Sequence, residues 1–126
     1  MSRILVIDDD RAFRNTVRRF LENEGHEVID AENGEAGLAM FHQFAPELVV
    51  TDMFMPGIGG METIQRIRKE NSNVKIIAVS GTGGFGAATL LTNAEQSGAD
   101  SSLAKPFRRD EFVKTVELLL PKDTSS

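Results

Sequence analysis

The stretch LVVTDMFMPG, residues 48–57, joins an apolar run to an acid and then to a turn with proline and glycine. Three other strand-like runs end at polar groups in the same way: residues 4–7 at Asp8-Asp9-Asp10, residues 76–79 at Ser80, and residues 101–104 at Lys105-Pro106. If the four runs are parallel strands of one sheet, their carboxyl ends meet at one edge. The sequence therefore predicts a crevice that gathers three carboxylates, a hydroxyl and an ammonium.

Strand-like and helix-like segments alternate along the chain. Strands are predicted at residues 3–7, 26–29, 47–51, 74–79 and 100–104. Helices are predicted at residues 11–24, 35–44, 61–70, 87–97 and 112–120, the fourth of them weak. This alternation indicates an α/β fold with one doubly wound, five-stranded parallel sheet of order 2-1-3-4-5, flavodoxin-like, covered by helices on both faces. The switch between the first and third strands falls beside Asp8, Asp9 and Asp52.

Length and composition indicate a single domain, expected over residues 1–121 and followed by a frayed tail over 122–126. The net charge of −5 argues against direct binding of nucleic acid. The absence of cysteine excludes disulfides and thiol catalysis, and two histidines, His26 and His42, are too few for a typical metal cluster. Because the chain lacks an apolar run near about 18 residues and room for a signal peptide, we expect a cytoplasmic protein without a membrane span.

The predicted crevice has the groups that phosphoryl chemistry needs. Carboxylates are ligands that Mg²⁺ prefers, and clustered carboxylates repel one another until a cation arrives. With the cation bound, Asp52 can act as a nucleophile towards phosphorus. Lys105 can stabilise negative charge on the phosphoryl oxygens, and the Ser80 hydroxyl can donate a hydrogen bond to one of them. The product is an acyl phosphate, which water hydrolyses, so the modification is transient.

Five motifs follow one another along the chain: Asp8-Asp9, Asp52 with Met55-Pro56 and Gly60, Ser80-Gly81, Gly98-Ala99-Asp100, and Lys105-Pro106-Phe107. Together and in this order they resemble the receiver domain of two-component response regulators, over essentially the whole chain. One such motif alone carries little information. All of them in order, four at predicted strand ends, are specific.

The resemblance implies that Asp52 is the phosphoacceptor, that Ser80 is the switch hydroxyl and that Lys105 contacts the phosphoryl group. It implies a Mg²⁺ site, which Mn²⁺ can also fill, with these ligands: Asp9, Asp52, the backbone carbonyl of Phe54 and, through water, Asp8. It also implies a histidine kinase or histidine phosphotransfer protein as the phosphoryl donor. The output is then control of a downstream protein or a fused effector domain, without the turnover of an enzyme.

Three features depart from the family pattern or modify it. Ser102 stands three residues before the lysine, where the family usually has an aromatic that swings inward with the switch hydroxyl. The stretch from Ser80 to Gly98 is about three residues longer than the common pattern and rich in glycine. Phe54 is a bulky apolar group beside the site, and it is expected to hinder water and lengthen the phosphorylated lifetime.

Other charged residues have simpler interpretations. Asp10 is expected to cap the first helix. Seven basic residues are expected to face water on helices or to form a solvated helix face: Arg11, Arg14, Arg18, Arg19, Arg66, Arg68 and Lys69. His26 and His42 are expected at the surface.

Other functions remain open at this stage. Asp8-x-Asp10 imitates the opening motif of haloacid dehalogenase-type phosphatases, which use an aspartate nucleophile, but Ala12 stands where that family has threonine. A flavodoxin-like cofactor module needs a phosphate loop after the first strand, where this chain has acids. A degenerate receiver that serves only for docking is the third alternative.

Overall fold

The structure is a computed structural model of the chain, and it describes residues 2–53, 57–81 and 98–120. Four sequence-based predictions therefore lie outside the described residues: the backbone carbonyl of Phe54 as a metal ligand, the Phe54 side chain as a hindrance to water, the weak helix at 87–97 and the frayed tail at 122–126.

Five strands form one parallel sheet. They are β1 (Arg3–Ile7), β2 (Glu27–Ala31), β3 (Leu48–Asp52), β4 (Lys75–Ser80) and β5 (Ser101–Ala104). Their order is β2-β1-β3-β4-β5, which confirms the predicted topology. The central strand β3 is buried along its whole length, as expected for a strand with helices on both faces. β2 extends further than predicted and includes Asp30.

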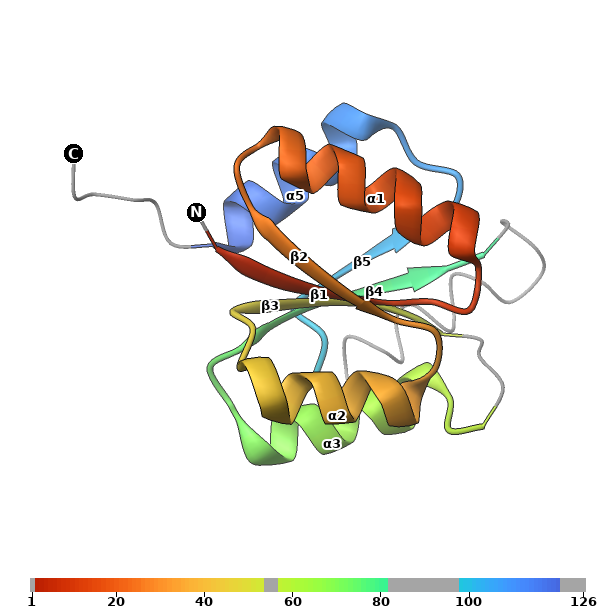
Figure 1. Ribbon diagram of the computed structural model, residues 1–126, viewed down its shortest axis with the longest axis vertical. Helices are drawn as coiled ribbons and strands as arrows, with labels where there is room; N and C mark the ends of the chain where they lie inside the picture. The colour runs from red at the N-terminus through yellow and green to blue at the C-terminus, as the bar shows by residue number, and fades with distance from the viewer. Residues whose placement is uncertain (1, 54–56, 82–97, 121–126) are drawn as a thin grey trace.

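Helices cover both faces of this sheet (Figure 1). α1 (Arg11–Asn23) and α5 (Arg109–Leu119) lie on one face, while α2 (Gly34–Phe44) and α3 (Gly60–Glu70) lie on the other. Each face has its own apolar core. Val17, Leu21 and Phe112 belong to the core on the α1 and α5 face, whereas Leu38 and Ile64 belong to the opposite core. Among the helices that the structure describes, none combines the length and the apolar character that a membrane crossing requires.

Local chemistry sets where α1 begins and ends. The Asp10 side chain accepts hydrogen bonds from the backbone N–H groups of Ala12 and Phe13, so it caps the helix as predicted. After the helix, Gly25 has a φ of +87°, a conformation that glycine adopts without steric cost. The chain then turns directly into β2. The first turn of α1 is thereby fixed just beyond the acidic residues that end β1.

The start of α3 packs tightly against the end of β3. A Cβ atom at Gly60 would lie 2.3 Å from the carbonyl oxygen of Asp52 and 2.7 Å from the Cα of Met53. Only glycine allows this approach of one backbone to another. The close packing holds the carboxyl end of β3 in place, and this is where the sequence places its candidate nucleophile.

Candidate functional site

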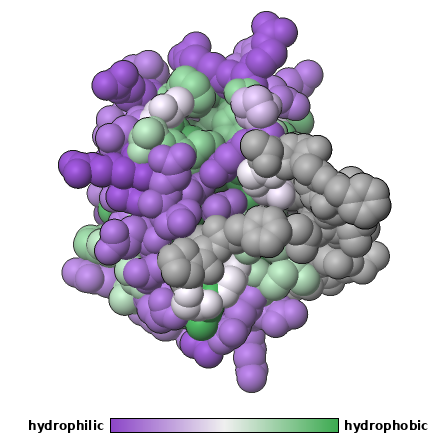
Figure 2. All heavy atoms as spheres, turned by 90° about the vertical axis from the view of Figure 1, so that its right-hand side faces the viewer, coloured by the Kyte–Doolittle hydropathy of each residue, from purple (hydrophilic) through white to green (hydrophobic). Residues whose placement is uncertain are grey.

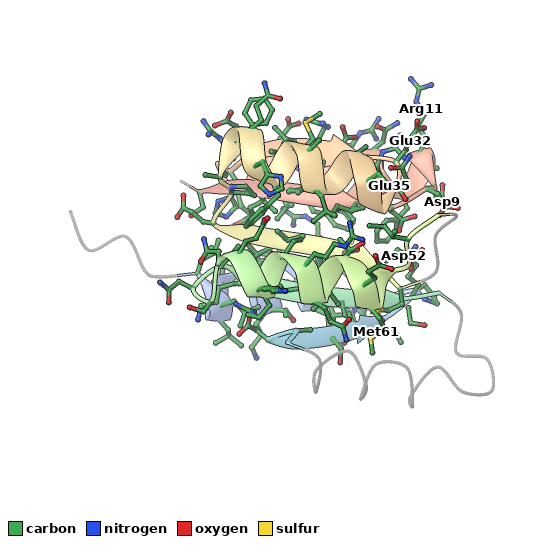
Figure 3. All side chains as sticks on the ribbon, turned by 90° about the horizontal axis from the view of Figure 1, so that it is seen from below. Asp9, Arg11, Glu32, Glu35, Asp52 and Met61 are labelled. Carbon is green, nitrogen blue, oxygen red and sulfur yellow. The ribbon has the colours of Figure 1, made fainter. Side chains whose placement is uncertain are left out.

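The ends of four strands meet at one edge of the sheet, as the sequence predicted. Ile7 pairs with Thr51 in register, so Asp8 and Asp52 follow side by side on neighbouring strands. On the other side of β3, Ser80 ends β4, and Lys105 follows β5. In Figure 3, Asp9 and Asp52 project at this same end of the sheet. The edge faces the viewer in Figure 2, where much of the coloured surface is hydrophilic.

Three carboxylates gather at this edge. One oxygen each from Asp8, Asp9 and Asp52 can be chosen so that all three lie within 4.8 Å of one another. Asp8 is fully buried and Asp52 is 6% exposed, whereas Asp9 is exposed to solvent. Such a set of hard oxygen donors, open on one side, fits a divalent cation that keeps some of its water.

Burial and crowding perturb Asp52. Loss of solvation raises the pKa of its carboxyl from 3.8 to about 6, and the negative charge of Asp8 adds to this shift. The ammonium of Lys105 opposes it, as does the hydrogen bond that Asp52 Oδ1 accepts from the backbone N–H of Met53 at 3.0 Å. Ionised Asp52 is therefore a strained group that gains from a nearby cation.

Lys105 is the cation that the structure places beside these acids. Its Nζ donates to Asp8 Oδ2 at 2.7 Å and lies 4.0 Å from Asp52 Oδ1. Its backbone N–H donates to the Ser80 carbonyl at 2.8 Å, which fixes the start of the following loop against β4. The peptide bond between Lys105 and Pro106 is cis. The ammonium thus faces both buried carboxylates.

Ser80 lies at the same edge and is fully buried. Its hydroxyl makes a long hydrogen bond to the carbonyl of Gly81, at 3.4 Å. A hydroxyl with so weak a partner can change that partner for a stronger acceptor at little cost.

Two arginines of α1 differ from the prediction of a solvated face. Arg14 donates through Nη1 to the backbone carbonyl of Asp8 at 2.7 Å and through Nε to Asp30 Oδ2 at 3.2 Å. Arg18 pairs with Asp30 Oδ1 at 3.2 Å and donates to the Val28 carbonyl at 2.9 Å. The prediction failed because β2 extends to Asp30, which brings a carboxylate under the helix. Arg14 thereby restrains the backbone at the start of the acidic turn.

Arg68 of α3 was also predicted to face water, and this is wrong. Its guanidinium donates to the Gly98 carbonyl at 2.7 Å and to Asp100 Oδ2 at 2.8 Å. It also reaches the carbonyls of Ser72 and Val74. Asp100 Oδ2 accepts in turn from the backbone N–H of Ile76 at 2.8 Å. Arg68 therefore holds Gly98 and Asp100, which lead into β5, against α3 and β4.

The two histidines take different positions. His42 is exposed and pairs with Glu70 across α2 and α3, while His26 is partly buried and accepts a hydrogen bond from the Ser2 backbone N–H at 3.1 Å. Burial lowers the pKa of the His26 ring. Neither histidine belongs to the cluster of acids that could hold a cation.

Comparisons with known proteins agree with this geometry. The family model of the response regulator receiver domain matches residues 4–117. Protein PilH of Pseudomonas aeruginosa is 32% identical, with 95% of this chain and 98% of PilH covered. Sporulation initiation phosphotransferase F of Bacillus subtilis is 29% identical, with 94% of each chain covered. Response regulator MprA of Mycolicibacterium vanbaalenii is 33% identical, and this chain spans only about half of it, 52%.

Solved structures show the same likeness. The receiver domain of NtrX from Brucella abortus superposes with a TM-score of 0.87 at 31% identity, over 97% of this chain and 99% of that one. The chemotaxis protein CheY4 of Vibrio cholerae superposes with a TM-score of 0.85 at 25% identity, over 95% and 99%. The fold, the acidic edge and the match over residues 4–117 lead to one conclusion: the chain belongs to the response regulator receiver domain family.

Proposed function

We propose that this receiver takes a phosphoryl group onto Asp52 from a histidine kinase or a histidine phosphotransfer protein. The observation that carries the proposal is the cluster of Asp8, Asp9 and Asp52 facing the ammonium of Lys105. A buried carboxylate with its pKa raised to about 6 is a perturbed group of the kind that functional sites contain. The same cluster argues for Mg²⁺ as the cofactor.

The chain's own groups divide the work. An oxygen of Asp52 attacks phosphorus, and the bond from phosphorus to the donor nitrogen breaks. Asp9 and Asp52, with Asp8 through water and the Phe54 carbonyl, would hold Mg²⁺ or Mn²⁺. When bound, the cation neutralises charge on the phosphoryl oxygens. Lys105 is already 4.0 Å from Asp52 and can neutralise the same charge from the other side.

Ser80 is the proposed switch. Its buried hydroxyl ends β4 beside Asp52 and has only a long hydrogen bond to give up. A phosphoryl group brings strong acceptor oxygens and negative charge, which can draw the hydroxyl towards Asp52. The end of β4 and the loop after it would then change conformation.

The output of such a receiver is a changed surface rather than a released product. The acyl phosphate forms and decays on the protein itself, so the chain acts as a signalling domain and not as a turnover enzyme. We propose a cytoplasmic receiver that controls a downstream protein or a fused effector domain and makes no direct contact with nucleic acid. RpaA of Synechocystis, a DNA-binding regulator, is 35% identical but is matched over only 49% of its length.

The test is labelling of the intact chain with acetyl phosphate and Mg²⁺, read by mass spectrometry. We expect one added phosphoryl group in the wild type and none in Asp52→Asn. Asp110→Asn is a matched control, because Asp110 lies on α5 with an exposed side chain, and it should label as the wild type does. Full labelling of Asp52→Asn would overturn the assignment. Sustained hydrolysis of a free phosphate ester would favour the phosphatase alternative, and no labelling of the wild type would favour a docking-only receiver.

A further inference from the structure

Aromatic rings gather beside Lys105, on the α1 and α5 side of the sheet. The ring of Phe13 on α1 meets that of Phe107 edge-on, with centroids 5.7 Å apart. Phe107 stacks on Phe112 of α5, with centroids 5.2 Å apart and planes 11° from parallel. Phe112 is fully buried, and its ring also packs against that of Phe20, with centroids 6.4 Å apart. The cluster therefore fixes the position of Phe13 from behind.

The ring of Phe13 in this cluster contacts the ammonium of Lys105. Lys105 Nζ lies 3.8 Å from the centroid of the Phe13 ring, well within the range of a cation–π contact. The same atom donates to Asp8 Oδ2 at 2.7 Å, and the Lys105 side chain is only 18% exposed. A cation–π contact is stronger where water is excluded. Lys105 is thus held between a carboxylate and a ring.

Asp8 and Phe13, the two partners of the Lys105 ammonium, differ in their other roles. Asp8 is also one of the three acids that could hold a cation, so its carboxylate has a second task. Phe13 has no charge, no polar atom and no metal to bind. An ammonium has three donors on a flexible stem and needs a restraint to stay in one direction.

We propose that Phe13 is a positioning residue, whose ring face keeps the Lys105 ammonium directed at Asp52 when Asp8 turns to the metal. The inference rests on the proposed function, since it assigns the ring a role in that phosphoryl transfer. An aliphatic side chain at this place would fill the same space, but it lacks the negative face that attracts a cation. Phe13 acts through Lys105 and touches no reacting atom.

Stepwise fluorination of the ring tests the electrostatic part of this contact. Fluorine withdraws charge from the ring face and changes its size little. Phe13 and Phe20 line the same hollow of about 330 Å³, which leaves room for fluorine at either place. Phenylalanine with one, two or three fluorines would be placed at position 13. Phe20 is the matched control, because it belongs to the same cluster and contacts Phe112 rather than Lys105.

Two readouts separate this inference from the proposed function. The first is NMR of Lys105 in the free protein, where the ring face shifts the terminal methylene and ammonium signals upfield, and where no phosphorylation is needed. The second is the affinity for beryllofluoride with Mg²⁺, measured by calorimetry. We expect it to fall with each fluorine at position 13, by about two- to thirtyfold in total, from the usual strength of the contact. The series at position 20 should leave it unchanged.

Each result decides one question. A flat affinity series at position 13, or Lys105 signals without an upfield shift in the wild type, would overturn the positioning role. Equal falls at positions 13 and 20 would also overturn it, since they would report a disturbed cluster. If the wild type bound no beryllofluoride and took no phosphoryl group, the proposed function would fail, while the Lys105 signals would still test the contact.

Discussion

Charged side chains are paired and exposed at the amino ends of the strands, but crowded and largely buried at the carboxyl ends. At the amino end, Arg3 of β1 pairs with Glu27 of β2 at 3.1 Å, and both side chains are about half exposed, 40% and 48%. At the carboxyl end, Asp8 and Asp52 are buried beside the ammonium of Lys105, and Asp9 adds a third negative charge. Charges at the amino end are matched and hydrated, so they disturb nothing. The crowded acids at the carboxyl end destabilise the fold, and such strain is a sign of function.

Two glycines give the largest contrast between the ends. Gly60→Ala at the carboxyl end would push a Cβ into the Asp52 carbonyl, so we expect a loss of about 3 kcal/mol in the free energy of unfolding. Gly25→Ala, before the amino end of β2, meets no atom within 4 Å and should lose only about 1–2 kcal/mol through its positive φ. Urea unfolding followed by circular dichroism measures both. Equal losses would show that the backbone at the carboxyl end of β3 can move to accept the added Cβ, which would contradict the close packing described above.

Neutralising the acid at the centre of the site should stabilise the metal-free protein. The pKa of Asp52 is raised in the fold, from 3.8 to about 6. The folded chain therefore binds more protons than the unfolded chain between these values, and stability falls as the pH rises through this window. Above about pH 6 the full penalty is present. We expect Asp52→Asn to raise the free energy of unfolding by roughly 1–3 kcal/mol at pH 7.5.

Urea unfolding of Asp52→Asn and the wild type measures this difference, and its dependence on pH and Mg²⁺ is the control. Below about pH 3 the wild-type carboxyl is protonated in both states, so the advantage of Asp52→Asn should vanish there. Saturating Mg²⁺ should also remove it at pH 7.5, because the ion stabilises only the form with the carboxylate. A variant less stable than the wild type at pH 7.5 without metal would contradict the strained-site interpretation.

The acids should also contribute unequally to metal binding. Both oxygens of Asp8 already accept hydrogen bonds, one from Lys105 and one from the Asp10 backbone N–H, whereas Asp9 is exposed. We expect Asp8→Asn to lower the affinity for Mg²⁺ by about tenfold, as for groups outside the coordination sphere. We expect Asp9→Asn to lower this affinity more. Calorimetry suits this test, since the chain has no tryptophan or tyrosine to report by fluorescence. The reverse order would make Asp8 the direct ligand.

The amino end should give the smallest effect. Glu27→Gln removes an exposed ion pair with Arg3, and such pairs contribute about 0–1 kcal/mol to stability. We expect the free energy of unfolding, measured with urea, to fall by an amount within that range, and by less at high salt. A loss as large as that of Gly60→Ala would mean that the amino end is under strain too.

Sequence patterns were sufficient for the parts of the site that depend on strand ends. Asp8, Asp52, Ser80 and Lys105 each follow a strand-like run, and parallel pairing alone brings such positions together. The cap at Asp10 followed from an equally local signal, whereas the order of the strands followed from the usual order of a doubly wound fold.

What sequence reasoning missed depends on long side chains and on packing between elements. Arg14 and Arg68 look like surface residues in a helical pattern, yet their guanidinium groups reach backbone carbonyls outside their own helices, those of Asp8 and Gly98. Phe13 lies at an apolar position of a helical pattern, and nothing in its spacing indicates that Lys105 lies on the face of its ring. Such contacts follow from how α1 sits on the sheet, which periodicity does not specify.

The anchoring of Gly98 and Asp100 by Arg68 has a consequence for how this protein can vary in length. The point where the chain enters β5 is held by hydrogen bonds from Arg68 of α3 and from the Ile76 backbone N–H of β4, and none of these involves a residue between Gly81 and Gly98. An insertion or deletion between Gly81 and Gly98 would leave these contacts in place. The hydrogen bond from the Lys105 backbone N–H to the Ser80 carbonyl would likewise keep these two residues in register. This part of the chain can therefore diversify during evolution, or be redesigned, while the chemistry at Asp52 is left in place.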